Sequence, residues 1–160
     1  MPETRASAVI PADATAVWRL LRDFNGLPAW QPGVTHSSLR DGDAPDRVGS
    51  VRTLTLLTGE EVSESLVALD DHTRSLTYDI VKSPYAVQSY RSTLRVLPLT
   101  STGESAVEWT LTFDCAPALA DELTGTFRDG VFATGLRGLT DYFLSRGGGA
   151  PVSGAGDGAS

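Results

Sequence analysis

The stretch from Asp46 to Leu69 is the part of the sequence that most limits how this chain can fold. Apolar and polar residues alternate on both sides of Gly59, which is the pattern of two half-buried strands joined by a turn. A three-residue loop that ends with Gly59 in the left-handed conformation brings Arg52 opposite Glu64. Two opposite charges among leucine and valine side chains are typical neither of a plain core nor of a solvent-facing surface. They predict a partly apolar pocket with a few polar groups.

Further alternating segments lie on both sides of this hairpin. Together with the hairpin they predict six or seven strands joined largely by short turns, and therefore an antiparallel sheet with one face covered and the other exposed to water. The additional strands are expected at residues 4–10, 34–39, 75–81, 87–97 and 107–113.

Helical patterns are found after the first strand and again after the last strand. A 3.6-residue period that starts near Asp13 predicts a short amphipathic helix, and residues 27–30 add one more helical turn. The last helix is expected from about Pro117 to about Leu144, and its apolar stripe changes face near Gly130. We therefore expect the first half of this helix to roof a hollow and the second half to lie directly on the sheet.

The charge pattern limits the partners of the chain. Its net charge is −7, its isoelectric point is near 4.7, and Lys82 is its one lysine, so neither a nucleic acid nor a membrane surface is expected to bind. His36 and His72 lie far apart without neighbouring cysteines, which predicts no metal site. No cofactor-binding motif is found either. The expected partner is a small hydrophobic molecule, and the chain itself is expected to be a monomer or a homodimer.

The length of 160 residues suits one domain over residues 1–146, followed by a flexible tail rich in glycine, alanine and serine over residues 147–160. The single Cys115 allows no internal disulfide, and the N-terminal segment lacks the apolar core of a signal peptide. Both features favour the cytoplasm. No apolar run approaches the roughly 18 residues of a membrane span.

Several segments also carry a resemblance to a known family. They are the Val17-Trp18 and Leu20-Leu21 pairs, DFNGLPAWQP at 23–32, VGSVRTL at 48–54 with the later Glu64, the strand at 90–96, Glu108-Trp109, and residues 130–136. In these segments the chain resembles the START-like, Bet v 1-like superfamily (SRPBCC), and within it the bacterial polyketide cyclase/dehydrase-like group. The resemblance implies an α+β helix-grip fold: a seven-stranded curved antiparallel sheet wrapped around a long C-terminal helix, with two short helices after the first strand. Gln31 stands where many relatives have histidine, so no acid–base role is carried over to it.

The cavity of such a fold suggests the site residues. Arg52 is a candidate to pair with an enolate oxygen, Glu64 to take a proton beside a carbonyl, and Tyr90 to donate a proton to a leaving hydroxyl. Alternatively, Arg52 and Glu64 only neutralise each other, and the tyrosines are wall residues whose hydroxyls are hydrogen-bonded. The expected ligand-binding residues are Trp30, Gln31, His36, Leu54, Leu66, Tyr78, Tyr85, Ser92, Trp109, Phe113, Phe127 and Val131.

Three functions are compatible with this pattern. The first is a polyketide cyclase or dehydratase that acts by positioning and acid–base catalysis without a cofactor or metal. Aromatic rings with polar tips suit a flat, partly oxygenated ligand such as an aromatic polyketide. The second is a carrier or sensor that binds a small hydrophobic molecule without chemistry. The third is a partner protein whose pocket is filled by its own side chains.

Overall fold

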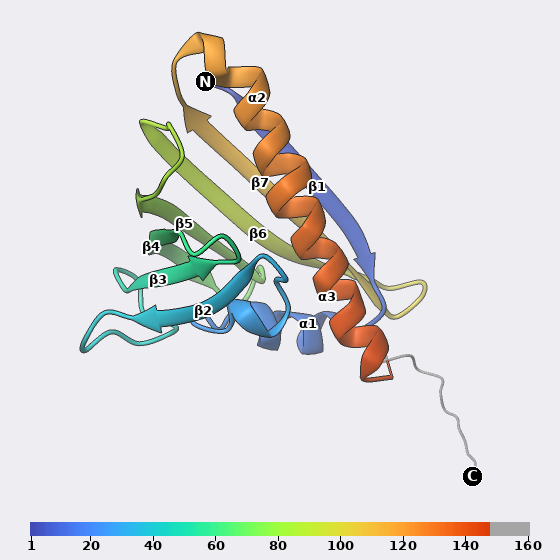
Figure 1. Cartoon of the computed structure of the whole chain (residues 1–160). Coiled ribbons are helices and arrows are strands. Elements are labelled where there is room, and N and C mark those ends of the chain that lie inside the picture. Colours follow the sequence, from blue (N-terminus) through green and yellow to red (C-terminus); the bar gives the residue numbers. More distant parts are fainter. Residues whose placement is uncertain (148–160) are drawn as a thin grey trace.

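The computed structural model describes residues 1–147 of the chain. Figure 1 shows a long C-terminal helix that crosses in front of one side of a sheet, with the other strands to the left of the helix and a short helix at one end of the sheet. The strands are β1 (Glu3–Ile10), β2 (Val34–Leu39), β3 (Val51–Leu56), β4 (Glu61–Asp70), β5 (Ser75–Lys82), β6 (Ser89–Leu99) and β7 (Glu104–Asp114). The helical segments are α1 (Ala14–Leu21), η1 (Leu27–Ala29), η2 (Pro117–Leu119), α2 (Ala120–Gly125), η3 (Thr126–Phe132) and α3 (Ala133–Ser145).

The seven strands form one antiparallel sheet in the order β1-β7-β6-β5-β4-β3-β2. Each strand from β2 to β6 pairs with the next one in the chain, and β1 lies at the edge of the sheet beside β7. This order confirms the predicted fold, a curved antiparallel sheet with two short helices after the first strand and a long helix at the C-terminus.

The β3–β4 hairpin has the predicted register. Arg52 pairs with Glu64 across the two strands, and the Leu56 amide donates to the Glu60 carbonyl at 2.9 Å. Gly59 has a φ of +90°, the left-handed conformation that a residue with a side chain adopts only with strain. The turn therefore fixes which residues of the two strands face each other.

The C-terminal helix is continuous but not uniform. Between α2 and α3, the segment η3 has π-helical geometry, in which each turn holds more residues than an α-helical turn. The wider turn lets two residues five positions apart within η3, Phe127 near its start and Phe132 at its end, both be buried. The predicted change of face near Gly130 thus coincides with a change in helix geometry.

Two glycines bring this helix close to the η1 segment. A Cβ atom on Gly135 would meet the side-chain amide of Gln31 and would lie 2.7 Å from Cζ3 of Trp109. A Cβ atom on Gly138 would meet the carbonyl oxygen of Trp30. The absence of a side chain at these two positions lets α3 pack directly on the chain around η1.

Helix α1 is fastened at both ends. Asp13 caps its N-terminus by accepting a hydrogen bond from the Ala16 amide at 2.9 Å. Near its other end, the Trp18 indole and the Arg22 guanidinium both donate to Asp71 in the β4–β5 turn, at 2.8 and 2.9 Å. These contacts hold the helix against one end of the sheet.

In residues 1–147, no helix is long and apolar enough to cross a lipid bilayer. Residues 148–160 of the predicted flexible tail lie outside the described residues. The organisation of residues 1–146 as a single domain stays a prediction.

Candidate ligand-binding site

A cavity of about 240 Å³ lies between strands β3 to β7 and the π-helical segment η3. Its lining is mainly apolar and aromatic, and it consists of Leu27, Gln31, Gly33, Val34, Leu54, Leu56, Leu57, Thr58, Val62, Glu64, Tyr78, Ile80, Tyr85, Tyr90, Trp109, Gly130 and Val131. Leu57, in the β3–β4 turn, is 70% exposed, so the cavity reaches the surface at that turn. The hollow expected beneath the first half of the C-terminal helix is therefore present.

The structure brings eight of the predicted site residues together around this cavity. They are Gln31, Leu54, Glu64, Tyr78, Tyr85, Tyr90, Trp109 and Val131. They come from segments far apart in the sequence, and the register of the sheet places the strand residues among them on its covered face.

Seven predicted site residues do not line the cavity. They are Trp30, His36, Arg52, Leu66, Ser92, Phe113 and Phe127. Most of them form a layer behind the wall: Phe127 packs edge-on against Tyr90 and Phe113, with ring centroids 5.1 and 5.2 Å apart, and Trp30 packs against Trp109. These residues support the lining and do not contact the hollow.

The prediction for His36 is wrong, and the reason is a bulge in β2. His36 is expected among the ligand-binding residues, but the β2–β3 register shifts between Val34 and His36, which interrupts the alternation along β2. The shift places Ser37 opposite the buried Leu54 and leaves His36 exposed. A strict two-residue alternation does not hold across the extra residue.

Arg52 and Glu64 form a buried ion pair. Nε and Nη2 of Arg52 both donate to Oε1 of Glu64, at 2.9 and 2.7 Å, and the two side chains are 5% and 8% exposed. The third guanidinium nitrogen, Nη1, donates to the carbonyl oxygen of Phe24 at 2.8 Å. The guanidinium carbon also lies 4.0 Å from the ring centroid of Phe24 and 5.1 Å from that of Tyr78. Each of the three guanidinium nitrogens of Arg52 thus donates to a partner within the protein, behind the cavity wall.

Glu64 is the member of this pair that reaches the cavity. Both hydrogen bonds from Arg52 end on Oε1, and in the described part of the chain no hydrogen bond reaches Oε2. Burial raises the pKa of the Glu64 carboxyl above its ordinary value, and the Arg52 guanidinium opposes that shift. Glu64 therefore brings to the cavity lining a carboxylate whose Oε2 has no hydrogen-bond donor among the described residues.

The hydroxyl of Tyr78 is held by a small polar network. The Trp109 indole N–H lies 3.1 Å from the Tyr78 hydroxyl and 3.0 Å from the Ser92 hydroxyl, and donates to both. Ser92 in turn donates to the carbonyl of Thr110 at 2.8 Å. Burial raises the pKa of Tyr78 and, well above its ordinary value, that of Tyr90. Both phenols therefore keep their protons at neutral pH, and each hydroxyl has a proton that it can donate in a hydrogen bond.

Gln31 ties the η1 segment to the roof of the cavity. Its side-chain nitrogen donates to the carbonyl of Val131 at 3.2 Å, and its side-chain oxygen accepts from the Gly33 amide at 3.3 Å. The amide is 4% exposed. Both ends of the side chain are therefore used within the protein, which suits a structural role.

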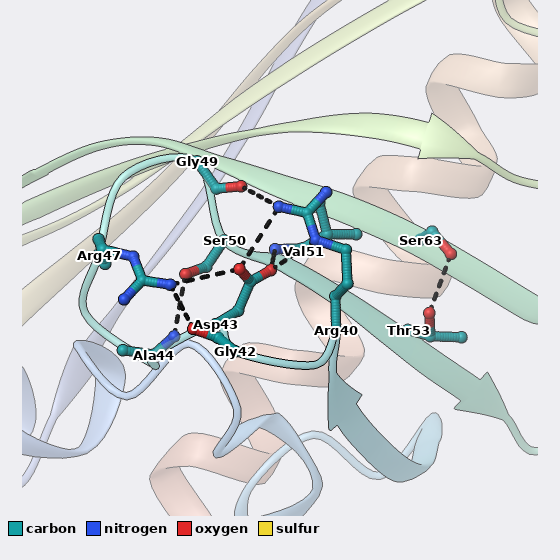
Figure 2. A network of polar contacts seen from close by, with 10 residues as sticks. All are labelled: Arg40, Gly42, Asp43, Ala44, Arg47, Gly49, Ser50, Val51, Thr53 and Ser63. Atoms are coloured by element: carbon teal, nitrogen blue, oxygen red, sulfur yellow. Dashed lines mark hydrogen bonds and ion pairs between the residues drawn. The ribbon is translucent and has the colours of Figure 1, made fainter.

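The loop between β2 and β3 supports the ion pair from outside. Figure 2 shows Asp43 between Arg40 and Arg47. Its carboxylate accepts from the Val51 amide at 2.8 Å and pairs with the two guanidinium groups at 3.0 and 3.3 Å. The same loop binds Phe24, whose amide donates to the Pro45 carbonyl at 3.0 Å.

Sequence reasoning did not identify Phe24 or Asp43 as parts of the site. Phe24 matters because its carbonyl and its ring both contact Arg52, and only the tertiary fold brings them there. For Asp43 a signal was present, since Arg40 and Arg47 lie three and four residues away from it.

No cluster of three or more histidine, cysteine, aspartate or glutamate side chains that could hold a metal ion is found in residues 1–147. The buried Cys115 lies outside the cavity lining, and its thiol donates to the neighbouring Ala116 carbonyl at 3.3 Å.

A curved antiparallel sheet, a long C-terminal helix and a cavity between them are the features of a helix-grip protein of the START-like, Bet v 1-like superfamily. The chain belongs to the family described as polyketide cyclase / dehydrase and lipid transport, whose model matches residues 1–146.

Known proteins of several kinds are similar to this chain. The protein XoxI from Bacillus cereus has a solved structure that is 33% identical, with a TM-score of 0.82, covering 92% of this chain and 99% of that one. The abscisic acid receptor PYL2 from Arabidopsis thaliana is 33% identical over 90 residues, which are 54% of this chain and 46% of the receptor. The chain thus matches about half the length of that receptor. Norcoclaurine synthase from Thalictrum flavum, at 18% identity and a TM-score of 0.72 over 89% of this chain and 86% of that one, shares the fold.

Proposed function

We propose that this protein binds a small aromatic or polyketide-type molecule in its cavity and promotes cyclisation or dehydration of that molecule. The observation that supports this most is the free Oε2 of Glu64, a buried carboxylate oxygen in an aromatic-walled hollow. A carboxylate held in this way is suited to act as a general base. The family membership agrees with this chemistry but also includes lipid transport.

The proposed reaction begins when Glu64 removes a proton from the carbon beside a carbonyl of the bound molecule. The electron pair of that bond passes to the carbonyl oxygen and gives an enolate. In a cyclisation, the enolate carbon forms a bond to a second carbonyl carbon, and the alkoxide that results takes the proton back from Glu64; in a dehydration, the C–O bond breaks and the hydroxyl group leaves with a proton as water. Tyr90 lines the cavity and keeps its proton, so it can donate a hydrogen bond to the enolate oxygen or a proton to the leaving hydroxyl. The walls hold the molecule in a folded conformation, which itself lowers the barrier.

Arg52 receives a different role from the one that its sequence position first suggested. Because its guanidinium is engaged by Glu64 and Phe24, it is poorly placed to contact an enolate oxygen. We propose that it orients the Glu64 carboxylate and keeps it ionised. It is a positioning residue, and no contact with the reacting molecule is required of it.

The exchange of carbon-bound hydrogen in 2-tetralone tests this proposal without knowledge of the natural substrate. This two-ring ketone carries acidic hydrogens beside its carbonyl, so in D₂O a general base exchanges them for deuterium. The wild-type protein is expected to accelerate the exchange, and Glu64→Gln to remove about a hundredfold or more of that acceleration. Glu61→Gln, an exposed position on the same strand, is the matched control and should exchange like the wild type.

A carrier or sensor without chemistry is the second candidate. It is favoured by the similarity to a plant protein named as a receptor, and by the hydroxyl of Tyr78, which already accepts a hydrogen bond from Trp109 within the wall. For a carrier, 2-tetralone should bind but should exchange no faster than in buffer. Under either function we propose a cytoplasmic monomer or homodimer that needs no metal or cofactor.

A further inference from the structure

We propose that the cavity selects uncharged aromatic molecules that carry a hydroxyl group and rejects those that carry a carboxylate. The inference rests on the proposed function in one respect only, namely that the cavity is where the ligand binds. It goes further by naming the charge and the hydrogen-bonding group of that ligand.

The first argument is the charge of the cavity lining. The lining contains one carboxylate, that of Glu64, and no lysine, arginine or histidine among the described residues. A second carboxylate placed in the same cavity would face a like charge without a cation of its own, which is unfavourable in a site whose lining is mainly apolar and aromatic.

The second argument is that Arg52 is not available to such a ligand. Its three guanidinium nitrogens donate to Glu64 and Phe24, and its planar group lies near the rings of Phe24 and Tyr78. It is not among the residues that line the cavity. A bound anion would have to displace Glu64 to reach it.

The third argument concerns the group that Glu64 can recognise. Its unused Oε2 is a hydrogen-bond acceptor, and an ionised carboxylate has no proton to donate. A ligand therefore needs a donor at this point, and a phenolic hydroxyl on an aromatic ring also suits the walls formed by Tyr85, Tyr90 and Trp109. A hydrogen bond between a hydroxyl and a carboxylate is among the stronger ones in proteins.

The fourth argument is size. The cavity of about 240 Å³ exceeds the roughly 150 Å³ cavity that is known to admit benzene in another protein. One or two fused aromatic rings fit such a space.

The charge at the mouth of the cavity also gives no attraction for anions. Glu60, a negatively charged residue, lies at the β3–β4 turn, where its carboxylate accepts a hydrogen bond from the Thr58 hydroxyl at 3.1 Å.

Four two-ring probes of similar size test the inference: 2-naphthol, 2-methoxynaphthalene, 2-naphthamide and 2-naphthoate. Binding to the full chain is measured at neutral pH by isothermal titration calorimetry. We expect 2-naphthol to bind best and 2-naphthoate to bind at least about tenfold more weakly than 2-naphthol and 2-naphthamide. The uncharged amide has nearly the shape of the carboxylate, so it separates charge from size. The methyl ether lacks the donor and should also bind about tenfold more weakly than 2-naphthol.

The Glu64→Gln variant tests whether Glu64 causes the weaker binding of 2-naphthoate. Its side-chain oxygen can still accept from Arg52, but the negative charge is gone, so the disadvantage of 2-naphthoate is expected to disappear or reverse. Glu61→Gln removes the same charge from an exposed position of the same strand and should keep the wild-type selectivity. Thermal melting shows whether each variant is folded. If Glu64→Gln is not folded, the comparison of the four probes on the wild-type protein still tests the inference.

Two results would overturn the inference, and they differ from each other. If the wild-type protein binds 2-naphthoate as tightly as 2-naphthol, the selectivity is wrong while the cavity remains a binding site. If none of the four probes binds, the cavity is not a site for aromatic molecules, and the proposed function fails together with the inference.

Discussion

Arg52 and Glu64 are direct cross-strand neighbours, yet only Glu64 lines the cavity. The arginine lies behind it, held by the carbonyl and the ring of Phe24. Arg52 therefore neutralises charge behind the cavity wall, and Glu64 is the member of the pair that a ligand can contact.

Replacing Arg52 by methionine should destabilise the protein by about 3–5 kcal/mol, because it leaves the Glu64 carboxylate buried without its partner. The free energy of unfolding in urea measures this loss. The double variant Arg52→Met with Glu64→Leu should recover much of it, since no charge then remains buried. Arg91→Ala, which breaks the exposed pair with Asp79, is the control and should cost far less. Equal losses for the buried and the exposed arginine would contradict the account.

The pH dependence of 2-tetralone exchange should show the raised pKa of Glu64. Because the carboxylate is the active form, the exchange rate should rise with pH through an inflection above about 4.3, the ordinary value for a glutamate. The contribution of Glu64 to the stability of the protein changes with pH in the opposite direction from the exchange rate. A raised pKa in the folded state favours folding at low pH, and this contribution is lost as the pH rises through the folded pKa. Exchange rates from pH 4 to pH 8, with Glu64→Gln as the reference, measure the inflection. An inflection at or below the ordinary value would show that the carboxyl is not desolvated.

The glycines of the C-terminal helix should divide into two classes. Gly138→Ala places a methyl group against the Trp30 carbonyl and should destabilise the protein by about 1–3 kcal/mol. Gly125→Ala meets nothing within 4 Å and should instead stabilise the helix, by about 0.5–1 kcal/mol. Thermal or urea unfolding of the two variants gives both signs. Stabilisation by both alanines would contradict the close packing of α3 on the η1 segment.

Asp43 should stabilise the β2–β3 loop in a pH-dependent way. The Val51 amide, and after it the Arg40 and Arg47 side chains, lower the pKa of this carboxyl, against the effect of its burial. Its contribution to stability is therefore present above the ordinary aspartate pKa and is lost as the pH falls through the lowered value.

In Asp43→Ala, the Val51 amide loses its acceptor and should exchange its hydrogen faster in native-state measurements. The variant Asp70→Ala, in the β4–β5 turn, offers a comparison, because that carboxylate also accepts from backbone amides, those of His72 and Thr73. It should leave the protection of Val51 unchanged. Unchanged exchange at Val51 in Asp43→Ala would show that the contacts in Figure 2 do not hold the loop.

The sequence was informative where local rules act alone. The position of Gly59 sets the length of the β3–β4 turn, and the turn then sets the pairing of Arg52 with Glu64, so this contact could be predicted from spacing. Alternation predicted the strands for a similar reason, since each one exposes one face and buries the other.

The sequence was less informative where distant segments meet. The bulge in β2 moved His36 out of the site, and nothing in the local pattern marks the extra residue. Alternation could place Arg52 on the covered face but could not show that Phe24 would occupy its guanidinium. The change of stripe in the last helix was visible, whereas the π-helical geometry of η3 that accompanies it was not.

The most direct test of the account is a crystal structure of the protein with 2-naphthol bound. We predict that the two rings lie in the cavity between Tyr90 and Val131, with the hydroxyl oxygen about 2.5–2.7 Å from Oε2 of Glu64. A cavity closed by its own side chains, or a naphthol bound elsewhere while Glu64 contacts only Arg52, would contradict it.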